Sequence, residues 1–259
     1  MTDTVTLHHV DAGPSEAPAV LLGSALGSTQ ALWDDLAADL ARDFRVVRFD
    51  TRGHGSSPAP AAAYTIEELA ADVLALADDL GLEEVAYVGL SLGGAIGQRM
   101  AVTHPHRLTS LVLCCTAPVF GSADTWTERA TTVRTEGMEA LVEATAERWF
   151  NRDFREQEPD QVARVMDLFR STPPAGYAGC CAALGAFDLT EELAAVRAPT
   201  LVVAGADDPT CPPSVGAAMV ESIPGSRLEV IKDAAHIANV AKPVAFNAAV
   251  RAHLERTAR

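Results

Sequence analysis

The sequence has few aromatic residues and lacks the segments that insert a chain into a membrane. Aromatic residues make up 5% of its 259 residues. No apolar run approaches the roughly 18 residues that a transmembrane helix needs. The N-terminal segment MTDTVTLHHVDAG contains no apolar stretch of the kind found in secretory signal peptides. We therefore expect a cytoplasmic protein with no membrane partner.

Cysteines at metal-binding or redox spacings are also missing. The count is odd, and two adjacent pairs match neither a zinc site nor a C-x-x-C motif. Free, buried thiols in a reducing compartment fit this pattern, and no metal is expected. The five cysteines are Cys114, Cys115, Cys180, Cys181 and Cys211.

Basic residues are outnumbered by acidic ones. Twenty Lys and Arg against 35 Asp and Glu give 20 − 35 = −15. Such a surface repels nucleic acid and anionic lipid, so neither is expected as a partner. An anionic small molecule would need local positive charge in its pocket. The sequence leaves a monomer and a homo-oligomer both open.

Short apolar runs alternate with helical patterns along the chain. Most of the runs are apolar nearly throughout, which is typical of strands covered on both faces. Helical patterns lie between most of them, at about 31–41, 65–80, 92–103, 214–223 and 243–255, and Thr65 with Glu68 resembles a capping box that opens the second. This alternation predicts an α/β fold with a mostly parallel, doubly wound sheet of about eight strands. The clearest strands are Ala19–Gly23, Arg45–Asp50, Val85–Gly89, Leu108–Cys114, Thr200–Gly205 and Arg227–Ile231.

One region interrupts this alternation. Residues 119–194 contain helical patterns such as Gly137–Phe150 and Pro159–Ser171 but no convincing strand. We interpret this region as a helical cap over the carboxyl edge of the sheet, where open α/β sheets bind ligands. The predicted core then comprises 1–118 and 195–259.

A candidate nucleophile lies in the segment YVGLSLGGAIGQ, residues 87–98. Ser91 stands between Gly89 and Gly93, at the end of a predicted strand and the start of a predicted helix. That context is the one a G-x-S-x-G nucleophile elbow requires. The glycines are needed because side chains beside the strained turn would collide with the strand and the helix.

A nucleophilic serine needs a base and an acid, which in this arrangement follow it in the order acid, then histidine. His236 lies in a loop after the last strand and is the predicted base. Asp208 follows the strand Thr200–Gly205 and is the predicted acid, with Asp207 and Asp233 as alternatives. His104 and His106 suit a helix end better, and His253 is expected to be solvated.

The oxyanion formed during catalysis needs two hydrogen-bond donors. The backbone N–H of Leu92 lies at the new helix's N-terminus. The loop Gly23–Thr29 supplies the backbone N–H of Ala25 as the second candidate. Arg52 and His54, in the segment DTRGHGSS, are expected to brace a turn.

With these residues in place, the chain resembles the 3-oxoadipate enol-lactonases (β-ketoadipate enol-lactone hydrolases) of the α/β-hydrolase superfamily. The segments that carry the resemblance span nearly the whole chain. They include YVGLSLGGAIGQ, STPPAGYAGCCAALGAFDL, APTLVVAGADDPTCPP and DAAHIANVAKPVAFN. In the family, the loop usually reads Ser-Asn-Ser where this chain has Gly23–Ser24–Ala25. A polar side chain near the pocket mouth is thereby lost, but the donor at Ala25 is a backbone group and can survive the change.

The resemblance implies that Ser91, Asp208 and His236 hydrolyse an enol-lactone that bears a carboxylate, a reaction of aromatic catabolism that needs no cofactor. Trp126 is then a candidate pocket wall and Arg129 a candidate partner of the substrate carboxylate. Arg134 and Arg148 are further candidates. The competing expectation pairs these three arginines with Glu128, Glu136 or Glu147 on the helix surface. A carboxylesterase, a C–C bond hydrolase, a cofactor-free haloperoxidase and a ligand receptor on this fold remain alternatives.

Overall fold

The computed structural model describes residues 4–258. One sheet crosses this part of the chain, in the order β1-β3-β2-β4-β5-β6-β7. β1 is antiparallel to β3, and every other neighbouring pair is parallel. The mostly parallel sheet is as predicted, with seven strands in the described residues where about eight were expected. The strands are β1 (His9–Ala12), β2 (Ala19–Gly23), β3 (Arg45–Phe49), β4 (Val85–Leu90), β5 (Leu108–Cys114), β6 (Thr200–Gly205) and β7 (Arg227–Ile231).

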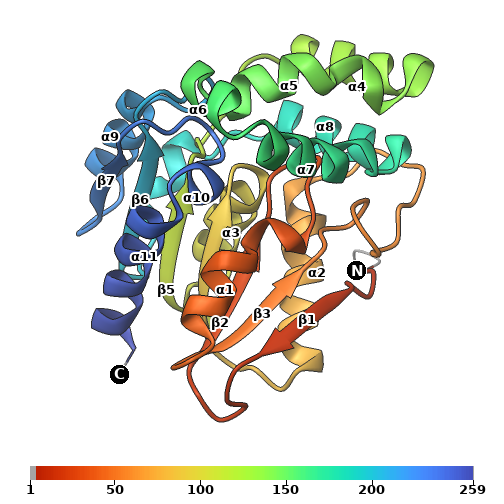
Figure 1. The fold of residues 1–259 in the computed structure, drawn as a ribbon. Coiled ribbons are helices and arrows are strands. Elements are labelled where there is room, and N and C mark those ends of the chain that lie inside the picture. The colour runs from red at the N-terminus through yellow and green to blue at the C-terminus, as the bar shows by residue number, and fades with distance from the viewer. Residues whose placement is uncertain (1–3, 259) are drawn as a thin grey trace.

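Helices cover both faces of the sheet, as the apolar strands require. Every residue of β2, β4 and β6 is buried. The helices α1 (Asp34–Leu40) and α11 (Pro243–Thr257) lie on one face, and α2 (Ile66–Asp79) and α3 (Leu92–Thr103) on the other (Figure 1). α9 (Pro213–Ser222) packs against β6 and β7. The remaining short elements around the sheet are η1 (Gln30–Trp33), η2 (Pro105–Arg107), η4 (Thr190–Ala195), which lies just before β6, and α10 (Ala238–Ala241).

The start and end of α2 follow directly from its sequence. The Thr65 hydroxyl accepts from the N–H of Glu68 at 3.2 Å, and the Glu68 carboxylate accepts from the N–H of Thr65 at 2.9 Å. This reciprocal pair is the predicted capping box. At the other end Gly81 adopts φ +69°, a conformation that glycine enters without strain.

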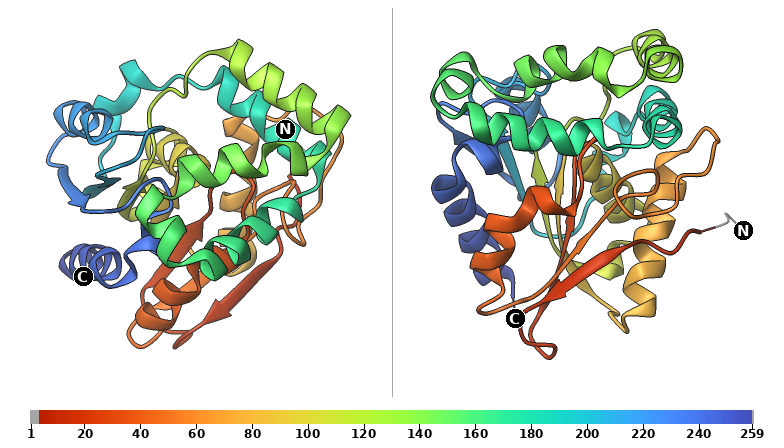
Figure 2. Two further views of the ribbon diagram at one scale, coloured as in Figure 1. Left: turned by 45° about the horizontal axis from the view of Figure 1, so that its top comes forward. Right: turned by 45° about the vertical axis from the view of Figure 1, so that its right-hand side comes forward.

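The segment between β5 and β6 is helical. Among the residues that the structure describes, a single bridge between Val119 and Asp188 is its strand-like pairing. Figures 1 and 2 show its helices lying across the carboxyl ends of the strands. The division into core and cap at 118/119 and 194/195 stays a prediction. The elements are α4 (Ala123–Glu136), η3 (Met138–Leu141), α5 (Val142–Trp149), α6 (Arg152–Gln157), α7 (Pro159–Arg170) and α8 (Pro174–Ala186).

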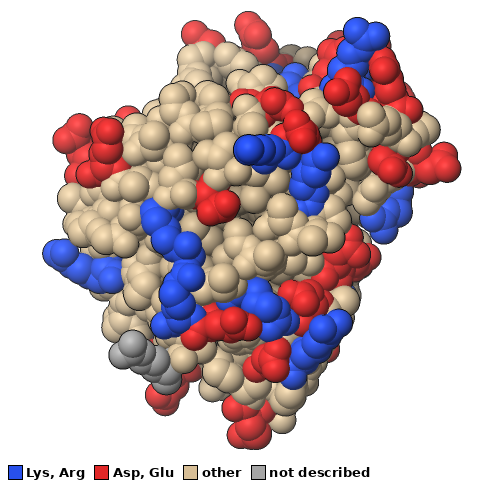
Figure 3. Space-filling view, turned by 60° about the vertical axis from the view of Figure 1, so that its left-hand side comes forward, with Lys and Arg blue, Asp and Glu red and all other residues tan. Residues whose placement is uncertain are grey.

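The structure also shows where the cysteines and the charged side chains lie. All five cysteines are free and buried, as expected. On the face seen in Figure 3, acidic and basic side chains are interspersed. Arg251, for example, lies 2.9 Å from Asp39 and 2.8 Å from Asp43. Within residues 4–258, no helix has the length and apolarity to cross a membrane.

Candidate active site

Ser91 occupies a strained turn between β4 and α3. Its φ and ψ are 55° and −111°, values that a residue with a side chain rarely adopts. A Cβ on Gly89 would lie 2.3 Å from the carbonyl oxygen of Gly93, and a Cβ on Gly93 would lie 2.2 Å from that of Gly23. Both glycines are therefore needed for the chain to make this turn, which lifts Ser91 above the end of β4.

His236 and Asp208 form a buried pair. The distance from His236 Nδ1 to Asp208 Oδ2 is 2.8 Å. The other oxygen, Asp208 Oδ1, accepts from the N–H groups of Thr210 at 2.8 Å and Cys211 at 3.1 Å. Burial alone would raise the pKa of Asp208. The charge of His236, its hydrogen bond and the two N–H groups outweigh burial, and the pKa is lowered. Asp208 is thus suited to remain an anion and to orient the ring of His236.

The alternative acids do not contact His236 in the structure. Asp207 is exposed and accepts instead from the Asn151 side chain at 2.7 Å. Asp233 lies exposed on the histidine loop with φ +53°. In the described residues, Asp208 is the carboxylate that meets His236.

The three other histidines that follow Ser91 have contacts different from those of His236. His104 and His106 contact each other after the end of α3, with ring centroids 6.3 Å apart. The expectation that His253 is solvated is wrong: it is 4% exposed and its Nε2 lies 3.2 Å from the carbonyl oxygen of Pro199. Position on the terminal helix suggested exposure, but α11 turns this residue toward the sheet. Burial lowers the pKa of His253.

Two backbone N–H groups flank Ser91 at the carboxyl edge. Leu92 is the first residue of α3, and Ala25 lies in the loop after β2. The carbonyl of Ser24 accepts from the N–H of Gly93 at 3.1 Å, which ties this loop to the nucleophile turn. Within residues 4–258, neither the Ala25 nor the Leu92 N–H takes part in a backbone hydrogen bond outside regular helix or strand pairing. Both are therefore available to an oxyanion.

A cavity of about 410 Å³ lies between the core and the cap. Ser91, His236 and Ala25 line its core side, and Trp126, Arg129 and Arg148 line its cap side. Sequence reasoning did not single out the remaining wall, since no local pattern marks it. Those residues are Leu26, Ala117, Val119, Phe120, Gly121, Thr125, Trp149, Leu184, Thr210 and Val215.

Trp126 and Arg129 are stacked on the cap side of the cavity. The indole N–H of Trp126 donates to the carbonyl of Phe120 at 2.5 Å, which fixes the ring. The guanidinium of Arg129 lies 5.5 Å from the Trp126 ring centroid and 5.8 Å from that of Tyr177. Such cation–π contacts hold an arginine without neutralising it.

Arg129 and Arg148 do not form the expected ion pairs within residues 4–258. In the described part of the chain, no carboxylate oxygen lies within 4.0 Å of Arg129 or Arg148, and Glu147 reaches Arg155 instead. Arg148 Nη2 donates to the Thr145 hydroxyl at 3.2 Å, and Arg129 Nη2 approaches the same oxygen at 3.5 Å. Burial, followed by the charge of Arg129, lowers the pKa of Arg148.

The other candidate arginines lie elsewhere. Arg134 lines a separate hollow with Ala61 and Pro174 and does not line the cavity that Ser91 and His236 share. Arg52 lies 2.7 Å from Asp72 in a buried ion pair. His54 accepts from the N–H of Gly27 in the oxyanion loop. Arg52 and His54 thus brace the turn as expected.

Asp208, Cys211 and His236 also bring three metal-binding atom types together. These atoms lie within 4.8 Å of one another. Two of them are already joined by the hydrogen bond between Asp208 and His236. Burial raises the pKa of the Cys211 thiol well above its usual value, which opposes formation of the thiolate that a metal binds. The chemistry of this donor set therefore favours a catalytic pair over a metal centre.

Comparisons with known proteins agree with this geometry. The sequence profile of the α/β-hydrolase fold family matches residues 18–243. The 3-oxoadipate enol-lactonase 2 of Acinetobacter baylyi is 36% identical over 97% of this chain and 94% of its own. The chain belongs to the 3-oxoadipate enol-lactonase family. It is a hydrolase of the α/β-hydrolase fold.

Two further proteins are similar to this member of the enol-lactonase family over most of its length. The crystal structure of the enol-lactonase from Burkholderia xenovorans superimposes with a TM-score of 0.95 at 40% identity, over 97% of each chain. A protein from Pseudomonas syringae named as a candidate carbamate hydrolase, RutD, is 31% identical over 93% of this chain and 95% of its own. The relatives named enol-lactonase are thus more similar in sequence than this carbamate-hydrolase relative.

Proposed function

We propose that this hydrolase opens the ring of 3-oxoadipate enol-lactone to give 3-oxoadipate, by an acyl-enzyme mechanism in which Ser91, His236 and Asp208 act together. One observation carries the choice of substrate. Arg129 and Arg148, which have no carboxylate partner among residues 4–258, line the same cavity as Ser91 and His236. The names of the most similar curated relatives support the same substrate.

The arginine pair is suited to an anionic group because two like charges share one small region. Both guanidinium groups approach the hydroxyl of Thr145, and each carries full positive charge at neutral pH. Their mutual repulsion is relieved when an anion enters between them. In a chain of net charge −15, two arginines with no carboxylate partner in the described residues give an anionic substrate a local positive charge.

The first step forms the acyl-enzyme. Ser91 Oγ attacks the carbonyl carbon of the lactone while Nε2 of His236 takes the hydroxyl proton. Asp208 holds the other ring nitrogen and stabilises the imidazolium. The tetrahedral oxyanion lies between the N–H groups of Ala25 and Leu92. Losing one such donor typically slows catalysis about 100- to 1,000-fold.

Collapse of the intermediate breaks the ring C–O bond and expels an enolate. The imidazolium of His236 returns its proton to this leaving group, and the enol relaxes to a ketone. Water then gives a proton to His236 and attacks the acyl carbon, and Ser91 leaves as the alcohol. The sum is lactone plus water to 3-oxoadipate. This sequence of steps calls on no cofactor, and a cytoplasmic location suits a small, freely diffusing substrate of this kind.

The test is a spectrophotometric assay of enol-lactone hydrolysis with a substrate panel. The panel contains p-nitrophenyl acetate, a C–C bond hydrolase substrate and a carbamate, and a bromide oxidation assay accompanies it. We expect sustained turnover with a strong preference for the lactone, and loss of turnover in a folded Ser91→Ala variant. Near wild-type activity of that variant would contradict the mechanism. A persistent adduct after a single turnover would indicate a receptor instead.

A further inference from the structure

A buried histidine accepts a hydrogen bond from the loop Gly23–Thr29, which we call the oxyanion loop. Nε2 of His54 accepts from the backbone N–H of Gly27 at 2.8 Å. Gly27 lies two residues after Ala25, the candidate oxyanion donor. His54 itself is 0% exposed and does not line the catalytic cavity. Any effect of His54 on the reaction is therefore indirect and passes through the backbone of the loop.

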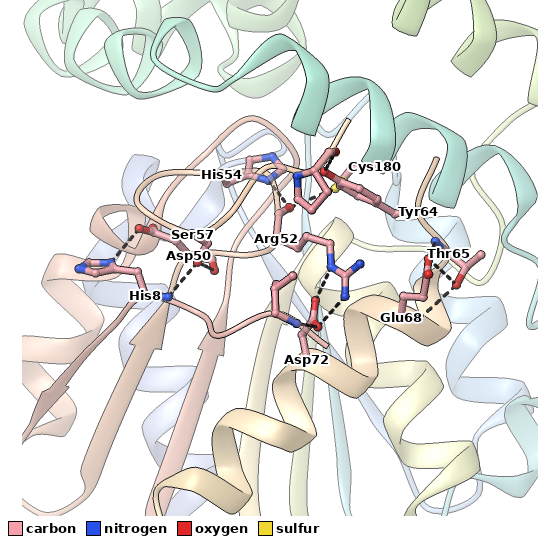
Figure 4. Close-up of polar contacts among 12 residues, drawn as sticks. His8, Asp50, Arg52, His54, Ser57, Tyr64, Thr65, Glu68, Asp72 and Cys180 are labelled. Atoms are coloured by element: carbon pink, nitrogen blue, oxygen red, sulfur yellow. Dashed lines mark hydrogen bonds and ion pairs between the residues drawn. The ribbon is translucent and has the colours of Figure 1, made fainter. Parts of the chain in front are cut away.

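The turn around His54 is fixed by its own contacts. His54 Nδ1 lies 3.2 Å from the carbonyl oxygen of Arg52. Arg52 in turn lies 2.7 Å from Asp72 on α2, and its carbonyl oxygen is 3.6 Å from Cys180 Sγ on α8 (Figure 4). The carboxylate of Asp50 accepts from Ser56 at 3.0 Å, at the far end of the same turn. The turn that carries the imidazole is thus fixed to α2 and to α8, and the ring contacts Gly27 from this fixed position.

The two hydrogen bonds of His54 define its tautomer. A backbone N–H can only donate, so Nε2 facing Gly27 carries no proton. A carbonyl can only accept, so Nδ1 facing Arg52 carries the proton. Burial lowers the pKa of His54 to about 4, which keeps the ring neutral at physiological pH. The ring therefore acts as a fixed acceptor for the loop.

The loop needs this acceptor because its conformation is restrained from the other side. Gly27 has φ +82°, and a Cβ there would lie 2.5 Å from Phe169 of the cap. The N–H of Gln30 is bound by Asp50 at 2.8 Å, which fixes the end of the loop. Between these points, Ser28 donates to the carbonyl of Ala25 through its N–H at 3.1 Å and through its hydroxyl at 2.7 Å. A shift of Gly27 is therefore passed to Ala25 through one tight turn.

We propose that His54 is a positioning residue for the oxyanion hole, and that its bond to Gly27 sets the direction of the Ala25 N–H. The inference rests on the proposed role of Ala25 but not on the identity of the substrate. An oxyanion donor acts chiefly in the transition state, so displacing it lowers kcat with little change in KM. A residue that merely stabilised the fold would show no such division.

Three substitutions separate positioning from stability. His54→Leu removes both hydrogen bonds. In His54→Asn the amide reaches the Arg52 carbonyl but is too short for Gly27. His54→Gln places an acceptor near the position of Nε2. For p-nitrophenyl acetate and for the enol-lactone, we expect kcat to fall about 10- to 100-fold in the first two variants. KM should change less than about three-fold, and His54→Gln should recover most of kcat.

Two further readouts complete the test. A boronic acid that forms a tetrahedral adduct with Ser91 should lose affinity in His54→Asn in proportion to kcat. In the wild-type protein, two-bond proton–nitrogen NMR of His54 should place the ring proton on Nδ1, a result that needs no variant to fold.

The proposal is overturned by an unchanged kcat in His54→Asn, by equal losses in His54→Asn and His54→Gln, by an effect on KM alone, or by a ring proton on Nε2. If the enol-lactone is not a substrate but p-nitrophenyl acetate shows the predicted division, the proposed function fails while this inference stands.

Discussion

Arg129 on α4 and Arg148 on α5 approach the same hydroxyl, that of Thr145, at 3.5 and 3.2 Å. Neither arginine meets a carboxylate within 4.0 Å among residues 4–258. Two guanidinium groups without a carboxylate partner among these residues, in a cavity that Ser91 also lines, are costly unless a ligand brings the counter-charge. Their position suggests that the cap recognises the substrate's carboxylate and the core performs the chemistry.

Arg129→Gln and Arg148→Gln should each weaken recognition of the anionic lactone. A hydrogen bond to a charged group contributes about 1.5–3 kcal/mol, so kcat/KM for the enol-lactone should fall about 10- to 100-fold. Hydrolysis of neutral p-nitrophenyl acetate should change less than about three-fold. The matched control is Arg152→Gln, because Arg152 is exposed and pairs with Glu156 at 2.7 Å. Equal losses of kcat/KM for both substrates would show that Arg129 and Arg148 do not recognise the charge of the substrate.

Substitution of the two adjacent aspartates should have very different effects. Asp208→Asn removes the anion that orients His236, and comparable changes in serine hydrolases lower kcat about 10,000-fold. Asp207→Asn alters only the contact with Asn151, and we expect less than about a three-fold change. Steady-state kinetics of both variants under one set of conditions decides the point. A larger loss for Asp207→Asn reverses the assignment of the acid.

Acid should destabilise the protein partly through His54. Its pKa is about 4 in the folded state against 6.5 ordinarily, so the folded state binds this proton less readily than the unfolded state. Stability from this group is full above pH 6.5 and decreases between about pH 6.5 and 4, by about 3 kcal/mol in total. Urea unfolding across this range should show a flatter acid slope in His54→Gln than in wild type. Parallel curves would contradict a neutral, buried ring.

The thiols should be inert in the native state. Burial raises the pKa of all five cysteines. A thiol reagent such as iodoacetamide should therefore leave activity unchanged, while five thiols per chain react after denaturation. Rapid loss of activity with one thiol modified would place a cysteine, not Ser91, at the centre of the chemistry.

The sequence predicted best what depends on local pattern. The strands β2, β5, β6 and β7 appear with the expected bounds, and the runs of β2 and β6 are apolar and end at a glycine. The nucleophile turn follows from Gly89 and Gly93, whose missing side chains make room for it. Asp207 and Asp208 both follow β6; Asp208, the predicted acid directly before Pro209, is the one that pairs with His236 in the structure.

Contacts between distant segments were beyond sequence reasoning. The shared hydroxyl of Thr145 depends on how α4 packs near α5, and no spacing in the sequence encodes it. The burial of His253 depends on the angle of α11 against the sheet. The bond from Gly27 to His54 spans 27 residues and depends on two loops meeting. These details follow from tertiary packing, which a periodic pattern does not specify.

The most direct test of the central claim is the ratio of kcat/KM for 3-oxoadipate enol-lactone to that for p-nitrophenyl acetate in the wild-type protein. A carboxylate held by Arg129 and Arg148 should favour the lactone by about 100-fold or more, since each charged hydrogen bond contributes about ten-fold or more. A ratio near or below one would contradict the proposed substrate and indicate a general esterase.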